Sequence, residues 1–186
     1  MIDDIKFLDD STRPAPARFD NLTIAQRAPG RHLAMIHNHF RQNMEMLRDM
    51  IRQAAAGEVT PEELQKQAEA MPMWQNYRQF GALCGQHCQI INTHHSIEDQ
   101  SIFPLLRERS DVMRKIVDRL EAEHVIVHEL LVRLVAALND LVRTPGPSAF
   151  AAVKELYETL DRILLSHFGY EEESIGDALG VYEVMV

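Results

Sequence analysis

Residues 111–143, DVMRKIVDRLEAEHVIVHELLVRLVAALNDLVR, decide the fold. Apolar residues recur in this stretch at steps of three and four, the period of one face of an α-helix. They are Met113, Val117, Leu120, Val127, Leu131, Leu134 and Leu138. Ser110 offers a cap at the start, and Thr144-Pro145-Gly146-Pro147 stops the helix. The stretch therefore predicts one long helix with an apolar face.

Three other segments carry the same period. The first runs over residues 31–56, with Leu33, Phe40, Met44, Leu47 and Ile51 on its apolar face. The second runs from residue 73 to about 101 with Ile90, Ile91 and Ile97 inward, and Phe103-Pro104 predicts a kink before a turn to Arg107. The last runs from Ser148 to about Ser174, before Gly176, with Leu160 and Ile163 inward.

The connections complete the predicted architecture. Thr60-Pro61 is a good helix start, so a short extra helix is expected up to Ala70, between the first and second long helices. No stretch alternates as a strand does. We therefore predict an all-α chain, an antiparallel up-down-up-down four-helix bundle over residues 31–180. Residues 1–30 contain three prolines and no period, and are expected to form an irregular arm, either packed on the bundle or partly disordered.

Composition narrows the function classes. The 186 residues are 46% hydrophobic and 25% charged, the balance of an ordinary globular protein. A net charge of −9 disfavours binding to nucleic acid. No apolar run is long enough to cross a bilayer and no signal peptide is evident, so we expect a cytoplasmic protein with no membrane partner. The two cysteines do not make a disulfide scaffold.

Each predicted apolar face is interrupted by a histidine. They are His37 on the first helix, His94 on the second, His124 on the third and His167 on the last. Burying an imidazole is costly unless it has a partner, and burying a carboxylate is costlier still. A cation is the simplest partner that four such groups could share.

Counting residues to the shared turns tests whether these histidines meet. From His94 to the turn near Arg107 is 13 residues, and from Asp111 to His124 is also 13. From His124 to Arg143 is 19 residues, as it is from Ser148 to His167. Because each residue advances every helix by the same rise, the histidines are expected at one level of the bundle.

Two glutamates strengthen the case for a metal. Glu98 follows His94 by four residues and Glu171 follows His167 by four, so each pair shares one helix face. Glutamates and histidines from facing helices hold paired metal ions in bundle cores. A set of imidazoles and carboxylates without thiolate suits iron, manganese or zinc.

These motifs resemble the hemerythrin-like, or HHE cation-binding, domain. The resemblance rests on His37-Asn38, residues 93–104 (THHSIEDQSIFP), Glu123-His124 and residues 167–173 (HFGYEEE), and covers about residues 31–176. It implies a four-helix bundle with two non-haem iron ions joined by an oxo or hydroxo bridge, where manganese or zinc can substitute. It further implies His37, His94, His124 and His167 as terminal ligands, with Glu98 and Glu171 bridging the two ions.

The chain departs from the oxygen-carrying hemerythrins in its last helix. They carry His-x-x-x-x-Asp there, whereas Glu171 follows His167 by four residues. The pattern is closer to the repair and iron-sensing branches of the family. The resemblance also implies a fifth histidine ligand. His95 is the leading candidate, and His128 and His39 are the alternatives.

Other polar residues near the motifs have simpler interpretations. Asp99, Glu172 and Glu173 are expected to be solvated, with Asp99 as a candidate hydrogen-bond acceptor for a ligand. His87 is expected to be a core histidine, and Cys84 and Cys88 to be buried free thiols.

Two functions follow from the resemblance. The first is a di-iron protein that binds or reduces O₂, NO or peroxide. The second is an iron or oxygen sensor, or a regulatory interaction module, that uses the same site without turnover. Whether the protein is an enzyme is left open by the sequence, and its protein partners are not indicated.

Overall fold

The computed structural model describes residues 2–56, 83–144 and 146–186, and the chain is helical wherever it has regular structure there. Four long helices form the body: α1 (Ala28–Ala55), α3 (Leu83–Ile97), α5 (Asp111–Arg143) and α6 (Pro147–Val181). A short helix, α4 (Phe103–Arg107), extends α3. None of the described residues forms a strand, so the prediction of an all-helical chain with four long helices is confirmed. The extra helix expected up to Ala70, and residues 73–82 of the predicted second helix, lie outside the described residues.

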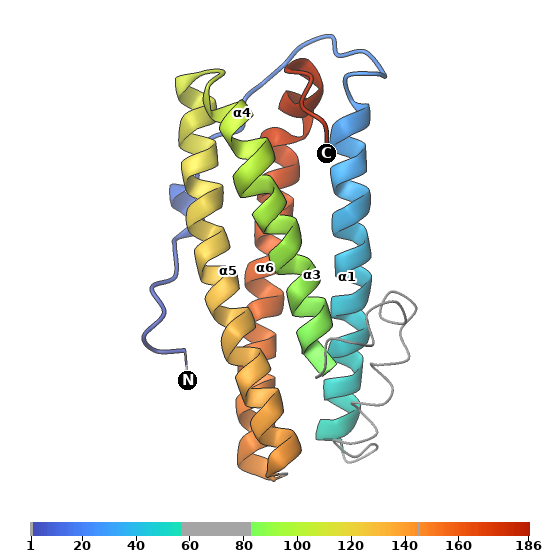
Figure 1. Ribbon diagram of the computed structural model, residues 1–186, viewed down its shortest axis with the longest axis vertical. Coiled ribbons are helices and arrows are strands. Elements are labelled where there is room, and N and C mark those ends of the chain that lie inside the picture. Colours follow the sequence, from blue (N-terminus) through green and yellow to red (C-terminus); the bar gives the residue numbers. More distant parts are fainter. Residues whose placement is uncertain (1, 57–82, 145) are drawn as a thin grey trace.

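The helices lie side by side along the long axis of the molecule (Figure 1). In that view α1 and α5 run downwards along the sequence, while α3 and α6 run upwards. Helix α6 packs against both α1 and α5, and α3 packs against α5. Each helix can therefore direct one face towards a common interior.

The long helix α5 has the bounds that the sequence predicts. The Ser110 hydroxyl accepts a hydrogen bond from the Met113 backbone N–H at 3.1 Å and so caps its first turn. All seven apolar residues predicted for its inner face are buried. They belong to two clusters: the lower cluster, towards Ile51 and Leu138, and the upper cluster, towards Leu33 and Leu179. The space between these clusters holds the polar residues described below.

The inner face of the second long helix differs from the prediction at one residue. Ile91 is fully buried as expected, but Ile97 is 53% exposed. The interior positions around it are taken by His95 and Glu98, which are buried. Only one side of a helix can face the interior, so the predicted apolar face of this helix included too many residues.

The predicted kink at Phe103-Pro104 is a widened turn that begins five residues earlier. Residues Glu98–Ile102 form a π-helical turn between α3 and α4. Pro104 has no N–H to donate, and its ring crowds the carbonyl group four residues before it. The wider turn accommodates this, and the Phe103 N–H donates to the Glu98 carbonyl group. Such turns concentrate at functional sites, and this one begins at a glutamate predicted to be a ligand.

Two helix ends lie farther out than the sequence predicts. Helix α1 begins at Ala28 rather than at Arg31, and α6 continues past Gly176 to Val181. Pro29 fits the first turn, where its missing N–H is not needed. The glycines are contact residues instead of stops: a Cβ atom added at Gly30 would lie 2.5 Å from the Gly176 carbonyl oxygen. Close approach of α1 and α6 is what requires glycine there.

These two glycines provide a matched pair of stability predictions. Gly30→Ala is expected to lower the free energy of unfolding by about 1–3 kcal/mol, because the new methyl group meets a backbone that cannot rotate away. Gly176→Ala should be neutral or stabilising by up to about 1 kcal/mol, because its Cβ would meet only Gly30 Cα, at 3.7 Å, and alanine favours helix. Urea denaturation of both variants measures the difference. Equal effects would contradict the close contact.

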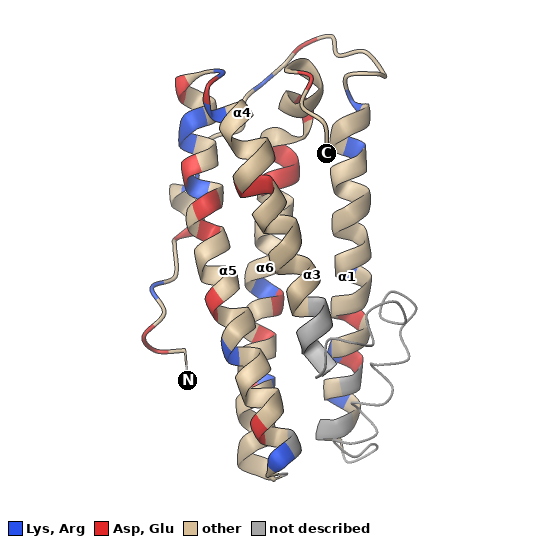
Figure 2. Cartoon of the chain, viewed as in Figure 1, with Lys and Arg blue, Asp and Glu red and all other residues tan. Residues whose placement is uncertain are grey.

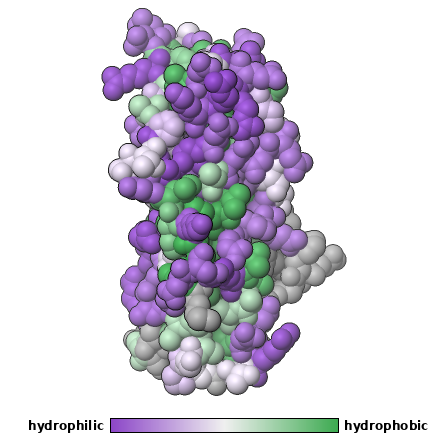
Figure 3. Space-filling model, turned by 90° about the vertical axis from the view of Figure 1, so that its left-hand side faces the viewer, coloured by the Kyte–Doolittle hydropathy of each residue, from purple (hydrophilic) through white to green (hydrophobic). Residues whose placement is uncertain are grey.

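The N-terminal arm packs on the bundle along most of its length. Ile2 and Ile5 contact the lower cluster, while Ala17 and Phe19 contact the upper cluster. The Tyr170 hydroxyl donates to the Pro14 carbonyl group at 3.1 Å. Figure 3 views the left-hand side of the molecule as it stands in Figure 1, and shows an apolar area at mid-height in a mostly hydrophilic surface. Of the two expectations for this segment, packing is the one that the structure shows.

No helix among the described residues combines the length and the apolar character needed to cross a membrane.

Candidate metal centre

Histidines and glutamates from all four long helices and the π-helical turn meet in the space between the lower and upper clusters. The residues predicted as ligands all take part; they are His37, His94, His95, Glu98, His124, His167 and Glu171. Six of them are buried, and the His94 side chain is 11% exposed. The structure thus brings together residues that are up to 134 positions apart in the sequence (171 − 37).

The residues form two groups. In the first group His37, His94, Glu98 and Glu171 offer ligand atoms that lie within 4.8 Å of one another. The second group consists of His95, His124 and His167, whose ligand atoms meet the same limit. Paired imidazole nitrogens mark each group: His37 Nε2 lies 3.0 Å from His94 Nε2, and His124 Nε2 lies 3.1 Å from His167 Nε2.

The two glutamates lie between the groups. Glu98 Oε1 is 3.1 Å from His94 Nε2, and its Oε2 is 3.8 Å from His124 Nε2. Glu171 Oε2 is 3.5 Å from His37 Nε2 and 3.4 Å from His167 Nε2. Each carboxylate therefore approaches one histidine of each group, which is the position that a ligand shared by two metal ions would occupy.

Three of the histidines have their other ring nitrogen fixed by a carboxylate. Their Nδ1 atoms lie 2.8–3.0 Å from carboxylate oxygens, in the pairs His37–Glu172, His124–Asp99 and His167–Glu123. An ionised carboxylate only accepts, so each Nδ1 carries the proton. When the ring is neutral, the lone pair is then on Nε2, which faces the cluster. Carboxylate support of this kind is typical of histidines that bind metals.

These supporting carboxylates revise the sequence prediction. Asp99 is the hydrogen-bond acceptor that the sequence suggested. Glu172 was expected to be solvated, but it accepts from His37, and its side chain is only 25% exposed. Glu123 belongs to a motif that carries the resemblance but was given no role, although its place beside His124 and four residues after Arg119 was a usable signal. It is buried and accepts from Arg119 Nε at 2.6 Å.

The fifth histidine of the cluster is His95. Its ring stacks on that of His124 with a centroid distance of 3.9 Å. The alternatives lie outside the cluster: His39 is exposed, and His128 is exposed with its Nδ1 2.7 Å from Asn92 Oδ1. Cys88 is buried, as predicted. The predictions for His87 and Cys84 concern side chains outside the described part of the chain.

The cluster is short of hydrogen-bond partners. Among the described residues, both oxygens of Glu98, both oxygens of Glu171 and His95 Nε2 are buried without a hydrogen bond. An unsatisfied buried carboxylate is among the costliest arrangements in a protein interior. His124 and His167 add a second conflict, because both Nε2 lone pairs would face each other if both rings were neutral. Metal cations between these atoms would resolve both conflicts, so the residues present fit a metal centre.

The pKa values of the cluster residues indicate which of them carry charge in the metal-free protein. Burial and the neighbouring Glu171 raise the pKa of Glu98 well above its usual value. The pKa of Glu171 is lowered despite its burial, because His167 and the other histidines face it. Burial lowers the pKa of His94 to about 3, whereas Glu123 and Glu171 raise that of His167 to about 9 against the effect of burial. One glutamate is therefore expected to bind a proton in the metal-free protein, while the other pairs with an imidazolium.

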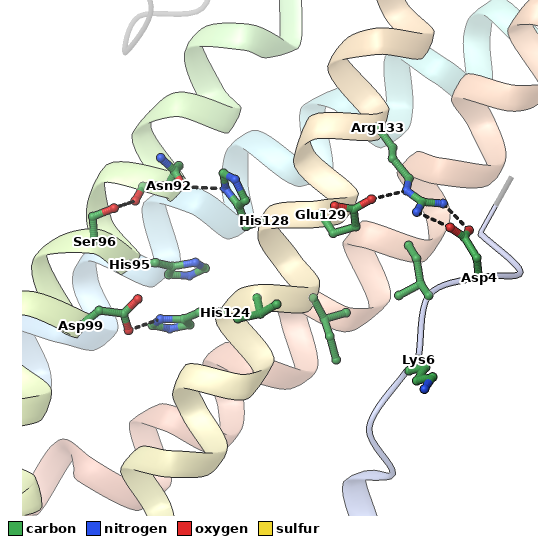
Figure 4. A pocket seen from close by; sticks show the side chains of 13 residues that line it. Asp4, Lys6, Asn92, His95, Ser96, Asp99, His124, His128, Glu129 and Arg133 are labelled. Carbon is green, nitrogen blue, oxygen red and sulfur yellow. Dashed lines mark hydrogen bonds and ion pairs between the residues drawn. The ribbon is translucent and has the colours of Figure 1, made fainter.

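A cavity of about 580 Å³ connects the second group to the surface. It lies between α3 and α5, and Figure 4 shows His95, Asp99 and His124 on one side of it, with Asp4 and Lys6 of the arm on the other. Figure 2 shows a red band of acidic residues in the upper half of the bundle, below the label of α4. A small polar molecule can thus approach the three-histidine group from solvent.

Comparison with known proteins agrees with this geometry. The family model described as hemerythrin HHE cation binding domain matches residues 28–179, most of the chain and all seven residues of the cluster. No curated protein and no solved structure matches the chain. With a buried histidine and glutamate cluster inside a four-helix body and a family match over that whole body, the chain belongs to the hemerythrin HHE cation-binding domain family.

Proposed function

We propose that the protein is a non-haem di-iron protein that binds or reduces O₂, NO or peroxide. The observation that carries this proposal is the position of Glu98 and Glu171, whose four oxygens are buried without hydrogen bonds between two groups of histidines. His37 and His94 would hold one iron ion, and His95, His124 and His167 the other. The two carboxylates would bridge the ions.

The donor set supports iron. It consists of imidazole nitrogens and carboxylate oxygens, which also suit manganese or zinc as substitutes. Bound iron would supply a position for a small ligand and electrons for its reduction.

The protein's own residues prepare the site in three ways. Glu172, Asp99 and Glu123 fix the histidine rings by their Nδ1 hydrogen bonds, so the site needs little rearrangement to bind metal. Aromatic side chains limit the access of water: Phe168 stacks on His37 at 4.2 Å, and Phe103 stacks on His124 at 5.3 Å between ring centroids. The cavity beside Asp99 would admit small ligands.

Two metal ions per chain are the expected stoichiometry. Anaerobic loading with Fe(II), followed by metal analysis, should give two iron ions and, after exposure to O₂, a near-ultraviolet charge-transfer band. Adding NO or peroxide to the reduced protein should change that spectrum. One ion per chain would contradict the di-iron proposal.

The same experiment separates the alternative function. A sensor or regulatory module would bind both ions but would not consume peroxide or NO over repeated additions. With a chemical reductant present to return the iron to Fe(II), consumption of many equivalents per chain would support the reducing function. A spectral change without consumption would contradict the reducing function and would support binding or sensing of the ligand.

A further inference from the structure

Arg13 of the N-terminal arm reaches into the wall of the candidate metal centre. Its Nε donates to Glu123 Oε1 at 2.8 Å, and its Nη2 donates to Glu123 Oε2 at 3.0 Å. Its remaining terminal nitrogen, Nη1, donates to Ser166 Oγ at 2.8 Å. The side chain is 15% exposed, and its guanidinium also lies over the Tyr170 ring at 4.8 Å. A residue from outside the bundle therefore makes a bidentate contact with a buried carboxylate.

That carboxylate is the one that fixes His167. Glu123 Oε2 accepts from His167 Nδ1 at 3.0 Å, and His167 is fully buried. The two oxygens of Glu123 have different hydrogen-bond partners. Oε1 accepts from Arg13 and Arg119, whereas Oε2 accepts from Arg13 and His167. Arg13 is thus the donor that holds both oxygens at once, and it keeps Oε2 directed at the imidazole.

The arm also restrains the competing arginine. Arg119 Nη1 donates to Thr12 Oγ1 at 2.7 Å, and Arg119 Nη2 donates to the Asp9 carbonyl oxygen at 3.0 Å. These contacts leave only Nε of Arg119 for Glu123. If Arg13 were absent, the carboxylate would lose its bidentate partner and would be able to turn towards Arg119, away from His167.

Among the described residues, no hydrogen bond or ion pair joins the arm to the carboxylates that support the other two histidines. Glu172, which supports His37, pairs with Arg41 at 2.7 Å, and Arg41 belongs to α1 like His37 itself. Asp99, which supports His124, is 39% exposed and is oriented from the π-helical turn. The support of His167 is therefore the one of the three that depends on residues before α1.

We propose that Arg13 is a positioning residue of the metal centre, which holds Glu123 on His167 and so makes the arm part of the site. The inference rests on the proposed function only in that His167 binds a metal ion. Loss of a carboxylate that orients a metal ligand lowers metal affinity about 10–100-fold. Arg13 contacts that carboxylate and not the ligand itself, so its loss is expected to weaken metal binding by up to about tenfold. The affected ion is the one held by His95, His124 and His167.

The test uses three variants of the full chain. Arg13→Met removes all donors and keeps the length of the side chain, and Arg13→Lys restores the charge without the bidentate geometry. Arg48→Met is the matched control, because Arg48 makes a bidentate contact with Asp161 between α1 and α6, at 2.8 and 3.0 Å, and neither residue belongs to the cluster. Circular dichroism first establishes that each variant is folded.

Two readouts are measured on the zinc-loaded protein. The first is the rate of zinc release to a chelator, where Arg13→Met should release one of two ions up to about tenfold faster than wild type. The second is the ¹H–¹⁵N spectrum of the histidine rings, where the His167 Nδ1–H signal should exchange faster with water while those of His37 and His124 stay unchanged. Arg13→Lys should give intermediate values, and Arg48→Met should match wild type.

The outcomes are distinct. Wild-type release and an unchanged His167 signal in Arg13→Met would overturn the positioning role. Equal acceleration in Arg13→Met and Arg48→Met would also overturn it, because the effect would then reflect general loosening. Failure of the wild-type protein to bind zinc or iron would instead contradict the proposed function. Exchange of the His167 Nδ1–H signal in the metal-free protein then still tests the role of Arg13.

Discussion

His124→Leu is expected to give a folded, helical protein that has lost the metal ion held by the three-histidine group and, with it, the iron absorbance. Leucine restores an unbroken apolar face in α5 and contributes roughly 1.5–3 kcal/mol of burial at this position. The ring that it replaces stacks between His95 and Phe103, so the space suits an apolar side chain. An aliphatic chain cannot replace a metal ligand.

The substitution removes a partner from Asp99 and from His167 Nε2, but His167 Nε2 keeps Glu171 Oε2 at 3.4 Å and Asp99 can reach water. Asp99, which accepts from His124 Nδ1, is 39% exposed and can be solvated once the ring is gone. The metal-free protein should therefore fold about as stably as metal-free wild type. Metal analysis, the near-ultraviolet spectrum and circular dichroism together measure both parts of this prediction.

His128→Leu is the control on the same helix, one turn further along. His128 is exposed, and its ring contacts Asn92 rather than the cluster. This variant should keep two ions per chain. An iron-replete His124→Leu protein with an unchanged spectrum would remove His124 from the metal centre and would undermine the two-group assignment.

Glu98→Gln is expected to change stability in opposite directions in the presence and absence of metal. In the metal-free protein, burial and Glu171 raise the pKa of Glu98 well above its value in the unfolded chain. The contribution of Glu98 to stability is then fully present below the unfolded pKa and is lost as the pH rises towards the folded pKa. Glutamine resembles the protonated acid at every pH, so it avoids this loss.

The size of the effect follows from linkage. The two metal-free proteins should be about equally stable near pH 4.5, and above that the variant should gain on wild type by up to about 1.4 kcal/mol per pH unit until Glu98 ionises in the folded state. At pH 7 the metal-free variant should therefore melt at a higher temperature than metal-free wild type.

Metal reverses the order. When the free iron concentration is a hundred times the dissociation constant, binding raises the free energy of unfolding of wild-type protein by about 2.7 kcal/mol. The variant lacks a bridging carboxylate, so its free energy of unfolding should rise little. Thermal melts at several pH values, with and without metal, measure both signs. Glu173→Gln, an exposed neighbour of the cluster, is the control and should change neither melt. A metal-free variant that is less stable than wild type at pH 7 would contradict the protonated Glu98.

Local pattern was sufficient for the helices and for most of the cluster. The three-to-four-residue period placed the inner faces of α1 and α5, because a helix that packs in a bundle must bury one apolar stripe. Histidines and glutamates on those stripes stood out because their burial demands a partner. Equal residue counts to each turn then predicted that they meet, since every helix rises by the same distance per residue.

Glycine and proline were less informative than the period of the helices. Glycine is common at helix ends, yet Gly30 and Gly176 both lie inside helices. Their role is to let two backbones approach, which depends on where the neighbouring helix lies. The widened turn at Glu98 also depends on tertiary structure. Pro104 predicts that the helix is interrupted, but the packing of α3 and α4 decides at which residues the turn widens.

The sequence by itself determined that the chain is helical and that six residues could share a metal centre, because both follow from helical periodicity and the cost of burying polar groups. Only the tertiary structure decided that His95 and not His128 joins the cluster, and that Asp99, Glu172 and Glu123 support its rings. It alone connected Arg13 to His167 through a carboxylate 110 residues away (123 − 13). Side chains at the border of a helix face can point to either neighbour, and the arm has no period, so these partners depend on distances between elements that no local pattern encodes.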